Sequence, residues 1–206
     1  MARPRGLVFG IGINDVSLPI RSVRKEYLGW VHMLNIINGP RSKTNGGATL
    51  DDRWIRFSNF IEWLHAQENW SEYELDPGIK VVGNRFYSPD TCVMVHPTVR
   101  RHLAHREQRG KKGLPRGVNR RKDLVGGRPV YSVTGRDPLA GKAVCLGTYD
   151  TPEDAHLAWQ IERIEHLRLC LPFANNLYVV ERLRNEMDRI ADDANNGRLT
   201  DSNHEN

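Results

Sequence analysis

Cysteine is scarce in this 206-residue chain, which contains only Cys92, Cys145 and Cys170. These three residues are far apart and include no CxxC pair, and an odd number cannot all pair within one chain. Their spacing argues against both a disulfide framework and a thiolate zinc site. We therefore expect each cysteine to be a small buried apolar residue in a reducing compartment.

Long apolar runs are also missing, since none approaches the roughly 20 residues that a bilayer requires. The short apolar stretch near the N-terminus is interrupted by Gly10, Gly12 and Asn14, and no small-residue cleavage site follows it. We expect no secretory signal and no membrane partner. A hydrophobic content of 39% and a mean hydropathy of −0.57 predict a soluble chain of one mid-sized or two small domains.

Positive charge is plentiful but unevenly distributed. Residues 100–122 hold ten of the thirty Lys and Arg residues and one acid, Glu107, so their charge of +9 exceeds the formal total of +5. A concentrated basic segment attracts a polyanion, most commonly a nucleic-acid backbone. A solvated linker, charged only to remain soluble, is the alternative interpretation.

The first half of the chain predicts two helices followed by a strand–strand–helix (ββα) unit. Apolar residues recur at helical spacing over 21–35 and over 54–67. Strands are expected at 73–76 and 91–95, separated by Pro-Gly and Gly-Asn turns, and a helix at 96–105. Four of the five tryptophans fall in the first third, where we expect them to fill a core.

The second half predicts strands at 130–134 and 143–149 and then two helices. Thr151 is a good cap for the first helix, because a proline and two acids follow it directly. Its expected apolar face is Leu157, Ile161, Ile164, Leu167 and Leu171. A C-terminal helix is expected within 172–194, followed by a polar tail, 195–206, that we expect to be disordered.

Three motifs connect the second half to DNA binding: RGV at 116–118, YSVTGRDP at 131–138 and GKAVCLGTYDTPEDAHLAW at 141–159. This text resembles the APETALA-type (ethylene-response-factor) DNA-binding domain. The resemblance implies three antiparallel strands packed on one helix over 116–171, with the sheet in the major groove. It also implies that Arg116, Arg121 and Arg136 touch DNA. Base preference does not carry over, because Tyr131, Cys145 and Asn119 replace two tryptophans and a basic residue of the family.

Physical reasoning supports the same interpretation. A small antiparallel ribbon fits the major groove, and the planar guanidinium of arginine can pair with the edge of guanine. Arg120 and Lys122 are predicted phosphate contacts, although arginines that are merely exposed on a small sheet remain the alternative. The predicted DNA-binding residues are Arg109, Lys111, Lys112, Arg116, Arg120, Arg121, Lys122, Arg136 and Lys142.

Residues 1–105 carry a second set of motifs, which includes GIGIND at 10–15, RFSNFIEWLHAQENW at 56–70 and GNRFYSPDTCVMV at 83–95. They resemble the HNH-type homing endonucleases of tailed bacteriophages. In that family a ββα unit, here about 73–105, binds one divalent ion, and an APETALA-type domain frequently follows it. A basic linker at 106–115 would connect the two parts here.

The chain departs from this family at its chemistry. Where the family usually has Leu-Asp-Lys-Asp, residues 75–78 read Leu-Asp-Pro-Gly, so a basic side chain and a carboxylate are missing. Asp76 remains a candidate ligand for Mg²⁺ or Mn²⁺, Asn84 a candidate for orienting a loop or water, and His96 a candidate base. Turn formation by Asp76 and a left-handed turn at Asn84 are the alternatives.

These observations together predict an α+β chain with an N-terminal helical and ββα unit, a basic linker, a three-stranded sheet on a helix, and a further C-terminal helix. The expected function is phage-encoded binding of double-stranded DNA with impaired cleavage and no required cofactor, in the cytoplasm of a bacterial host. An active Mg²⁺- or Mn²⁺-dependent endonuclease is the alternative. A third interpretation is an adaptor that binds a host protein through the tryptophan-rich N-terminal half.

Overall fold

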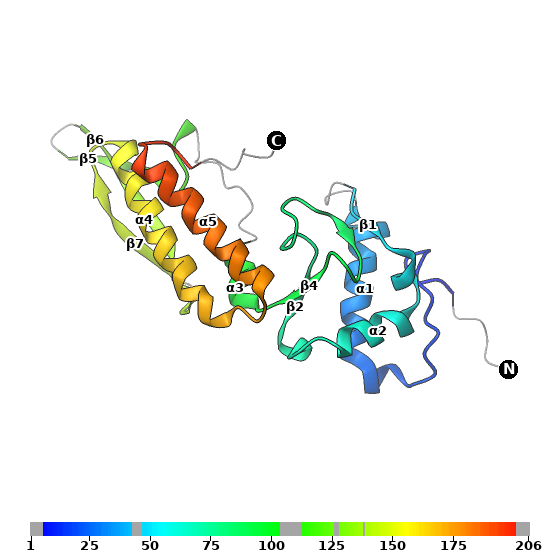
Figure 1. Ribbon diagram of the computed structural model, residues 1–206. Coiled ribbons are helices and arrows are strands. Elements are labelled where there is room, and N and C mark those ends of the chain that lie inside the picture. Colours follow the sequence, from blue (N-terminus) through cyan, green and yellow to red (C-terminus); the bar gives the residue numbers. More distant parts are fainter. Residues whose placement is uncertain (1–5, 43–46, 104–112, 126–127, 138, 201–206) are drawn as a thin grey trace. The chain divides into compact units, whose positions relative to one another are not determined.

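The computed structural model describes residues 6–42, 47–103, 113–125, 128–137 and 139–200, with the side chains of 122–128 left out. The chain mixes α-helices and β-strands, which confirms the predicted class (Figure 1). Its internal contacts divide it into two units, 1–95 and 96–206, a boundary that precedes the predicted one at residue 105. No helix in the described ranges has the length and apolar character needed to cross a bilayer.

The first unit contains the two predicted helical regions. Its helical segments are η1 (Ile20–Val23), α1 (Arg24–Asn38), η3 (Asp52–Ile55), α2 (Phe57–His65) and η4 (Trp70–Glu72). Asp15 fixes the start of α2, because its carboxylate accepts hydrogen bonds from the Ser58 backbone N–H at 3.0 Å and the Ser58 hydroxyl at 2.7 Å. A carboxylate at a helix N-terminus satisfies otherwise unpaired N–H groups and complements the helix dipole.

Tryptophans of the first third pack mainly into the core of this unit. Trp30 and Trp54 are fully buried, and the indole Nε1 of Trp30 donates to the Trp54 carbonyl at 2.8 Å. Phe57 lies against Trp30 with ring centroids 5.1 Å apart. The predicted core role is therefore confirmed for these two residues, since both are fully buried; Trp30 also pairs its indole N–H, whereas that of Trp54 has no hydrogen-bond partner among the described residues.

Two small strand pairs complete the first unit. The predicted strands appear as β2 (Glu74–Asp76) and β4 (Val93–Val95), which pair antiparallel. A parallel pair, β1 (Thr49–Leu50) with β3 (Phe86–Tyr87), was not predicted. The helix expected to complete the ββα unit, α3 (Pro97–Leu103), groups with the second unit. The predicted ββα unit is therefore divided, with β2 and β4 in the first unit and α3 in the second.

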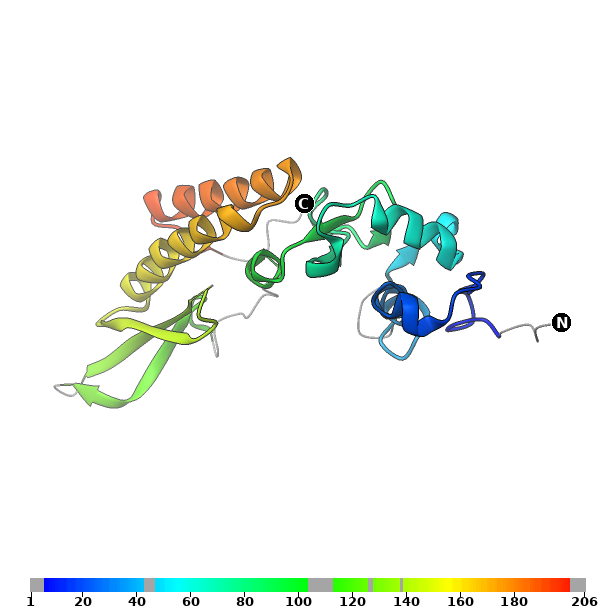
Figure 2. The same cartoon turned by 90° about the horizontal axis from the view of Figure 1, so that it is seen from below.

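The second unit is a sheet covered by two successive layers of helix. Its elements are β5 (Val118–Val125), β6 (Arg128–Arg136), β7 (Ala143–Tyr149), α4 (Pro152–Cys170), η6 (Leu171–Phe173) and α5 (Leu177–Asn195), together with α3. The three strands are antiparallel and follow chain order. Helix α4 lies between the sheet and α5, as Figure 2 shows. The predicted sheet on a helix with a further C-terminal helix is therefore present.

Helix α4 begins as predicted but buries only part of its predicted apolar face. The Thr151 hydroxyl accepts from the Asp154 backbone N–H at 3.1 Å, which is the expected cap. Leu157 and Ile161, expected in the core, are 42% and 56% exposed. Leu167, which was also predicted, is buried, and the other buried residues of α4 are Ala155, His156, Trp159, Gln160, Arg163, His166 and Cys170. The apolar spacing was misleading because the sheet and α5 cover two sides of this helix, where long-range hydrogen bonds satisfy polar side chains.

The residues after α5 pack against the helices and do not form the predicted disordered tail, 195–206. Thr200 is buried, and the Gln160 side chain donates to the Thr200 hydroxyl and the Arg198 carbonyl, both at 2.9 Å. The Thr200 hydroxyl donates to Asp193 at 3.1 Å. The prediction is thus wrong for the segment up to Thr200, because tertiary hydrogen bonds hold this polar stretch. The remaining tail lies outside the described residues.

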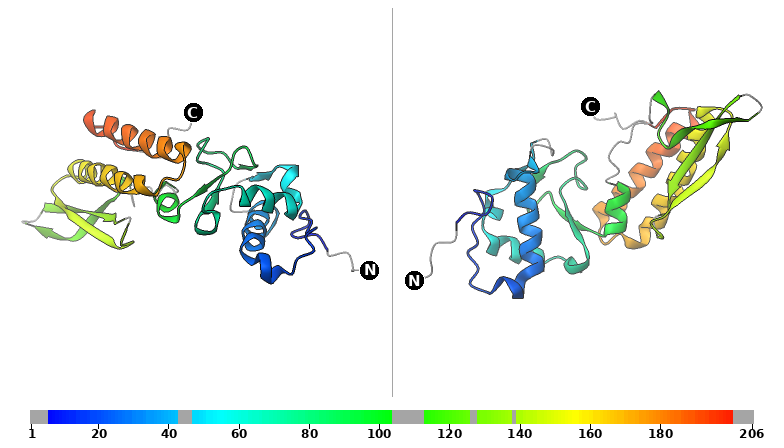
Figure 3. Two further views of the ribbon diagram at one scale, coloured as in Figure 1. Left: turned by 60° about the horizontal axis from the view of Figure 1, so that its bottom comes forward. Right: turned by 180° about the vertical axis from the view of Figure 1, so that it is seen from behind.

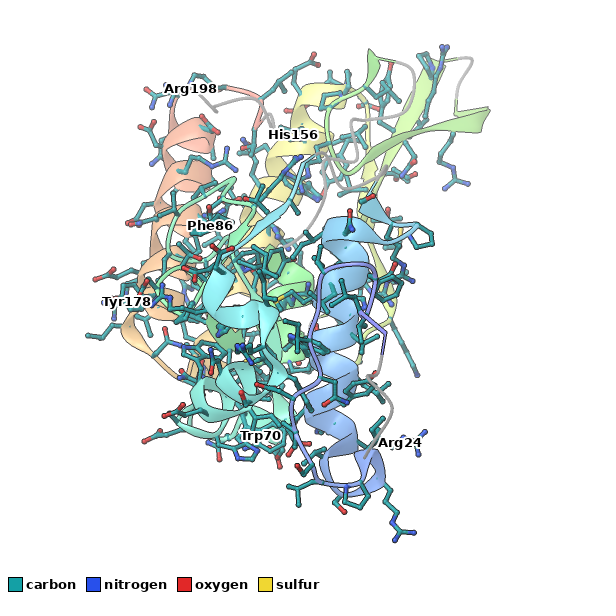
Figure 4. All side chains as sticks on the ribbon, turned by 90° about the vertical axis from the view of Figure 1, so that its right-hand side faces the viewer. Arg24, Trp70, Phe86, His156, Tyr178 and Arg198 are labelled. Atoms are coloured by element: carbon teal, nitrogen blue, oxygen red, sulfur yellow. The ribbon has the colours of Figure 1, made fainter. Side chains whose placement is uncertain are left out.

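His156 connects two distant segments of this unit. The Thr200 backbone N–H donates to His156 Nε2 at 2.9 Å, so that nitrogen carries no proton. The proton therefore lies on Nδ1, which donates to the Arg116 carbonyl at 2.9 Å. Figure 4 labels His156 on α4 and Arg198 beyond the end of α5. The neutral imidazole joins the start of the sheet to the C-terminal segment.

Candidate nucleic-acid interface

The three-stranded sheet has one face that packs on α4 and one that does not. Val118 and Val133 are buried against Ala155 and Trp159 of α4. Successive residues of a strand point to opposite faces, so the neighbours of these valines lie on the outer face. Figure 3 shows the sheet with α4 on one side only.

Small side chains cover much of this outer face. The cross-strand pairs are Ser132 with Thr148, Thr134 with Cys145 and Arg136 with Ala143, and Asn119 lies opposite Ser132. Among the side chains that the structure describes on β5, β6 and β7, none is acidic. A face whose described side chains are mostly small and not acidic allows a polyanion to approach closely.

Arg136 lies at the end of β6, next to a tight turn. Its Nε donates to the Gly141 carbonyl at 2.9 Å, and Gly141 has a φ of +66°, which a residue with a Cβ rarely adopts. Asp137 accepts from the backbone N–H groups of Ala140 at 2.8 Å and Leu139 at 2.7 Å. These hydrogen bonds lower the pKa of the Asp137 carboxyl. The turn is thus closed by hydrogen bonds between its own residues. The Arg136 side chain is exposed, and its hydrogen bond to the Gly141 carbonyl orients it.

Arg116 lies on the other side of the sheet from Arg136. Its guanidinium carbon is 5.2 Å from the centre of the Trp159 ring on α4, a cation–π contact. Gly117 brings the chain close to the same ring, because a Cβ there would lie 2.1 Å from Trp159 Cδ1. The structure therefore does not bring Arg116 together with Arg136 on the outer face.

The other predicted DNA-binding residues differ in where they lie and in whether the structure describes them. Arg120 and Arg121 are exposed on β5, and Arg120 lies opposite Tyr131, where the register of the strand pair begins to shift. Lys142 is exposed after the β6–β7 turn. Outside the described residues lie Arg109, Lys111, Lys112 and the side chain of Lys122. Arg101 is a residue that the sequence did not single out, although it belongs to the basic segment, and its Nη1 lies near the same turn.

In the first unit, Asp76 and Asn84 organise one loop. The Gly78 backbone N–H donates to Asp76 Oδ1 at 2.8 Å. The Asn84 amide donates to the carbonyls of Pro77 at 2.8 Å and Phe86 at 3.0 Å. The alternative of a left-handed turn at Asn84 is wrong, because Gly83 is the residue with positive φ. Both side chains therefore hydrogen-bond backbone groups of the same loop, at Pro77 and Gly78, and help to hold it closed.

His96 belongs to the second unit and begins α3. Its Nδ1 accepts from the Thr98 backbone N–H at 3.2 Å, which is a capping contact. Its ring stacks on Phe173 with centroids 4.7 Å apart. The described residues hold no group of three or more His, Cys, Asp or Glu side chains arranged to bind a metal ion. Asp76 was the one metal ligand that the sequence predicted. A divalent ion needs several oxygen ligands, and the described residues do not group other carboxylates around Asp76.

The cysteines follow the sequence expectation in two cases of three. Cys92 and Cys170 are buried, and burial raises the pKa of the Cys92 thiol to about 12 and that of Cys170 to about 11. Cys145 is exposed on the outer face of the sheet, opposite Thr134. The expectation of a buried residue is wrong there, because β7 turns Cys145 away from α4.

Comparisons of this chain with protein-family models, with curated proteins and with solved structures found no significant match.

Proposed function

We propose that the protein binds double-stranded DNA with the outer face of the sheet formed by β5, β6 and β7. The observation that carries this proposal is the character of that face. Its described side chains are small and carry no acid, and Arg136 and Lys142 lie at the β6–β7 end. A ribbon of this width fits the major groove, where the arginine fork can pair with guanine O6 and N7.

Two groups of basic residues have different roles in this proposal. Arg136, held through Nε by the Gly141 carbonyl, presents its guanidinium in one orientation, which suits base recognition. The basic segment before the sheet, which includes Lys111, supplies attraction to phosphates and carries no sequence information. The resemblance of residues 116–171 to APETALA-type domains supports the same assignment.

For the first unit we propose a degenerate HNH-type origin in a phage protein, with cleavage impaired or lost and a bacterial cytoplasm as its location. The hydrogen bonds of Asp76 and Asn84 support this, because they serve to close the loop between them. An active Mg²⁺- or Mn²⁺-dependent endonuclease is the second candidate. One observation favours it: Asp76 retains the aspartate of the family motif and lies partly exposed at the end of β2.

An adaptor that binds a host protein is the third candidate. The buried Trp30 and Trp54 are poorly placed for it, whereas Val81 and Val82 are exposed on the first unit. Recovery of a specific host protein after nuclease treatment of a lysate, lost in a Val81→Ser/Val82→Ser variant, would support this candidate over DNA binding.

A salt titration tests the DNA-binding proposal. We expect the affinity of the full chain for duplex oligonucleotides, measured by fluorescence anisotropy, to fall steeply between about 50 and about 200 mM salt. Arg136→Ala should reduce discrimination between duplex sequences, whereas Lys111→Ala should weaken binding to all of them equally. A flat salt response, or the same behaviour in both variants, contradicts the proposed reading face.

Incubation of supercoiled plasmid with the full chain and Mg²⁺ or Mn²⁺ tests the second candidate. We expect no nicked or linear product. Cleavage that disappears in EDTA and in Asp76→Ala, but persists in the exposed control Asp90→Ala, would establish the nuclease and overturn the degenerate assignment.

A further inference from the structure

Helix α3 is an integral part of the second unit. Val99 and His102 of α3 are buried, and His102 Nδ1 contacts the Thr98 carbonyl at 3.0 Å. The buried guanidinium of Arg163 on α4 donates to the His102 carbonyl. A cation at the C-terminal end of a helix satisfies an unpaired carbonyl and complements the helix dipole, so Arg163 caps α3.

Burial and the nearby Arg116 guanidinium lower the pKa of Arg163 to about 10, so the group stays protonated at neutral pH. His102 also extends to the sheet, with Nε2 3.5 Å from the Arg136 carbonyl. Through these contacts α3 is anchored at the end of β6.

This anchoring brings a third cation to the β6–β7 turn. Arg101, the residue before His102, has its Nη1 3.9 Å from the position of a Cβ on Gly141. The Gly141 carbonyl accepts from Arg136 Nε, and Lys142 is the next residue along the chain. Arg101, Arg136 and Lys142 therefore meet at one end of the sheet from separate segments. We call these three residues the turn cluster.

The charge of the turn cluster remains positive. The nearest acid in sequence, Asp137, uses its carboxylate to accept the Leu139 and Ala140 backbone N–H groups of the same turn. Three cations beside one carboxylate leave a net positive charge at this turn, which attracts anions. The cluster also lies beside the outer face, since Arg136 belongs to both.

We propose that Arg101 and Lys142 of the turn cluster bind phosphate groups of the DNA backbone beside the bases that Arg136 contacts, with Arg101 making a contact that fixes the end of the sheet on the duplex. This inference rests on the proposed function. It makes α3 part of the DNA-binding unit, which would then begin at α3 and not at residue 116. Charged contacts to phosphates position a protein and do not depend on base sequence.

Arg101→Gln in the full chain tests the inference, with Arg184→Gln on the exposed side of α5 as the matched control. We expect Arg101→Gln to weaken binding to every duplex about tenfold, the effect of losing one charge-assisted hydrogen bond. The slope of log K against log salt should become shallower by about 0.9, the value for one phosphate contact. Arg101→Lys, which keeps the charge, should restore the slope, and Arg184→Gln should change neither quantity.

The outcomes separate this inference from the function on which it rests. Binding by the wild type with an unchanged slope in Arg101→Gln overturns the role of Arg101 and leaves DNA binding intact. A wild type that does not bind duplex DNA at low salt overturns both. A sequence-dependent loss in Arg101→Gln also overturns a phosphate contact, and equal thermal midpoints of the four proteins exclude a folding defect.

Discussion

Replacement of Gly117 by alanine provides a direct test of how the sheet lies on α4. Gly117 has a φ of +79°, and a Cβ there would lie 2.1, 2.4 and 2.7 Å from Cδ1, Cγ and Nε1 of the Trp159 ring. The positive φ alone costs a residue with a Cβ about 1–2 kcal/mol. Overpacking against a ring that α4 holds in place adds about 1–3 kcal/mol.

Gly113 offers a control with the same backbone conformation and no clash. Its φ is +80°, and no atom of the described residues lies within 4 Å of a Cβ placed on it. Gly113→Ala should therefore cost at most the conformational term of about 1–2 kcal/mol, and Gly117→Ala about 2–5 kcal/mol in total. The difference between the two variants measures the close approach of Gly117 to Trp159.

Unfolding of the second unit can be followed through Trp159, which is its one tryptophan; the other four belong to residues 1–95. Labelling with 5-fluorotryptophan and urea denaturation monitored by ¹⁹F NMR would report the two units separately. We expect the Trp159 transition to move to lower urea in Gly117→Ala and the other four to remain unchanged. Equal destabilisation by the two substitutions would refute the proposed contact between strand and ring.

Three further predictions concern polar side chains that hydrogen-bond within the fold. Thr200→Val leaves Gln160 and Asp193 without the hydroxyl they share, so the free energy of unfolding of the second unit should fall by about 1–3 kcal/mol in urea denaturation. Burial lowers the pKa of His102 below its ordinary value of about 6.5, so the unfolded chain binds a proton more readily than the folded one. The free energy of unfolding should therefore fall as the pH drops below about 6.5. His102→Asn should remove part of this loss when urea denaturation is compared at about pH 7.5 and about pH 5.5. Asn84→Ala removes three side-chain hydrogen bonds of its loop and should increase amide exchange there, leaving the second unit unchanged.

Local signals in the sequence were sufficient to predict most helices and strands. The cap at Thr151 followed by proline and two acids predicted the start of α4, because capping depends on neighbouring residues alone. The strands around Asp76 and Val93 were predicted for a similar reason, since turn residues separate them. The parallel pair β1–β3 was missed, because two-residue strands carry no periodicity that a sequence can show.

The candidate interface was predicted only in part. Arg136 was selected from its motif, and it lies on the outer face as alternation on a strand requires. Arg116 was selected in the same way, but it packs on Trp159. Arg101 was not selected, because its position near Gly141 depends on how α3 is anchored.

The sequence by itself determined the mixed α and β class, the excess of positive charge before the sheet and the order of the elements. These properties depend on composition and on neighbours along the chain. Only the tertiary structure decided which side of α4 is buried and which cations meet at the β6–β7 turn. His156, Gln160 and Arg163 are buried because their partners, Arg116, Thr200 and His102, are distant in sequence and close in space. The periodicity of apolar residues along a helix cannot predict partners that are distant in sequence.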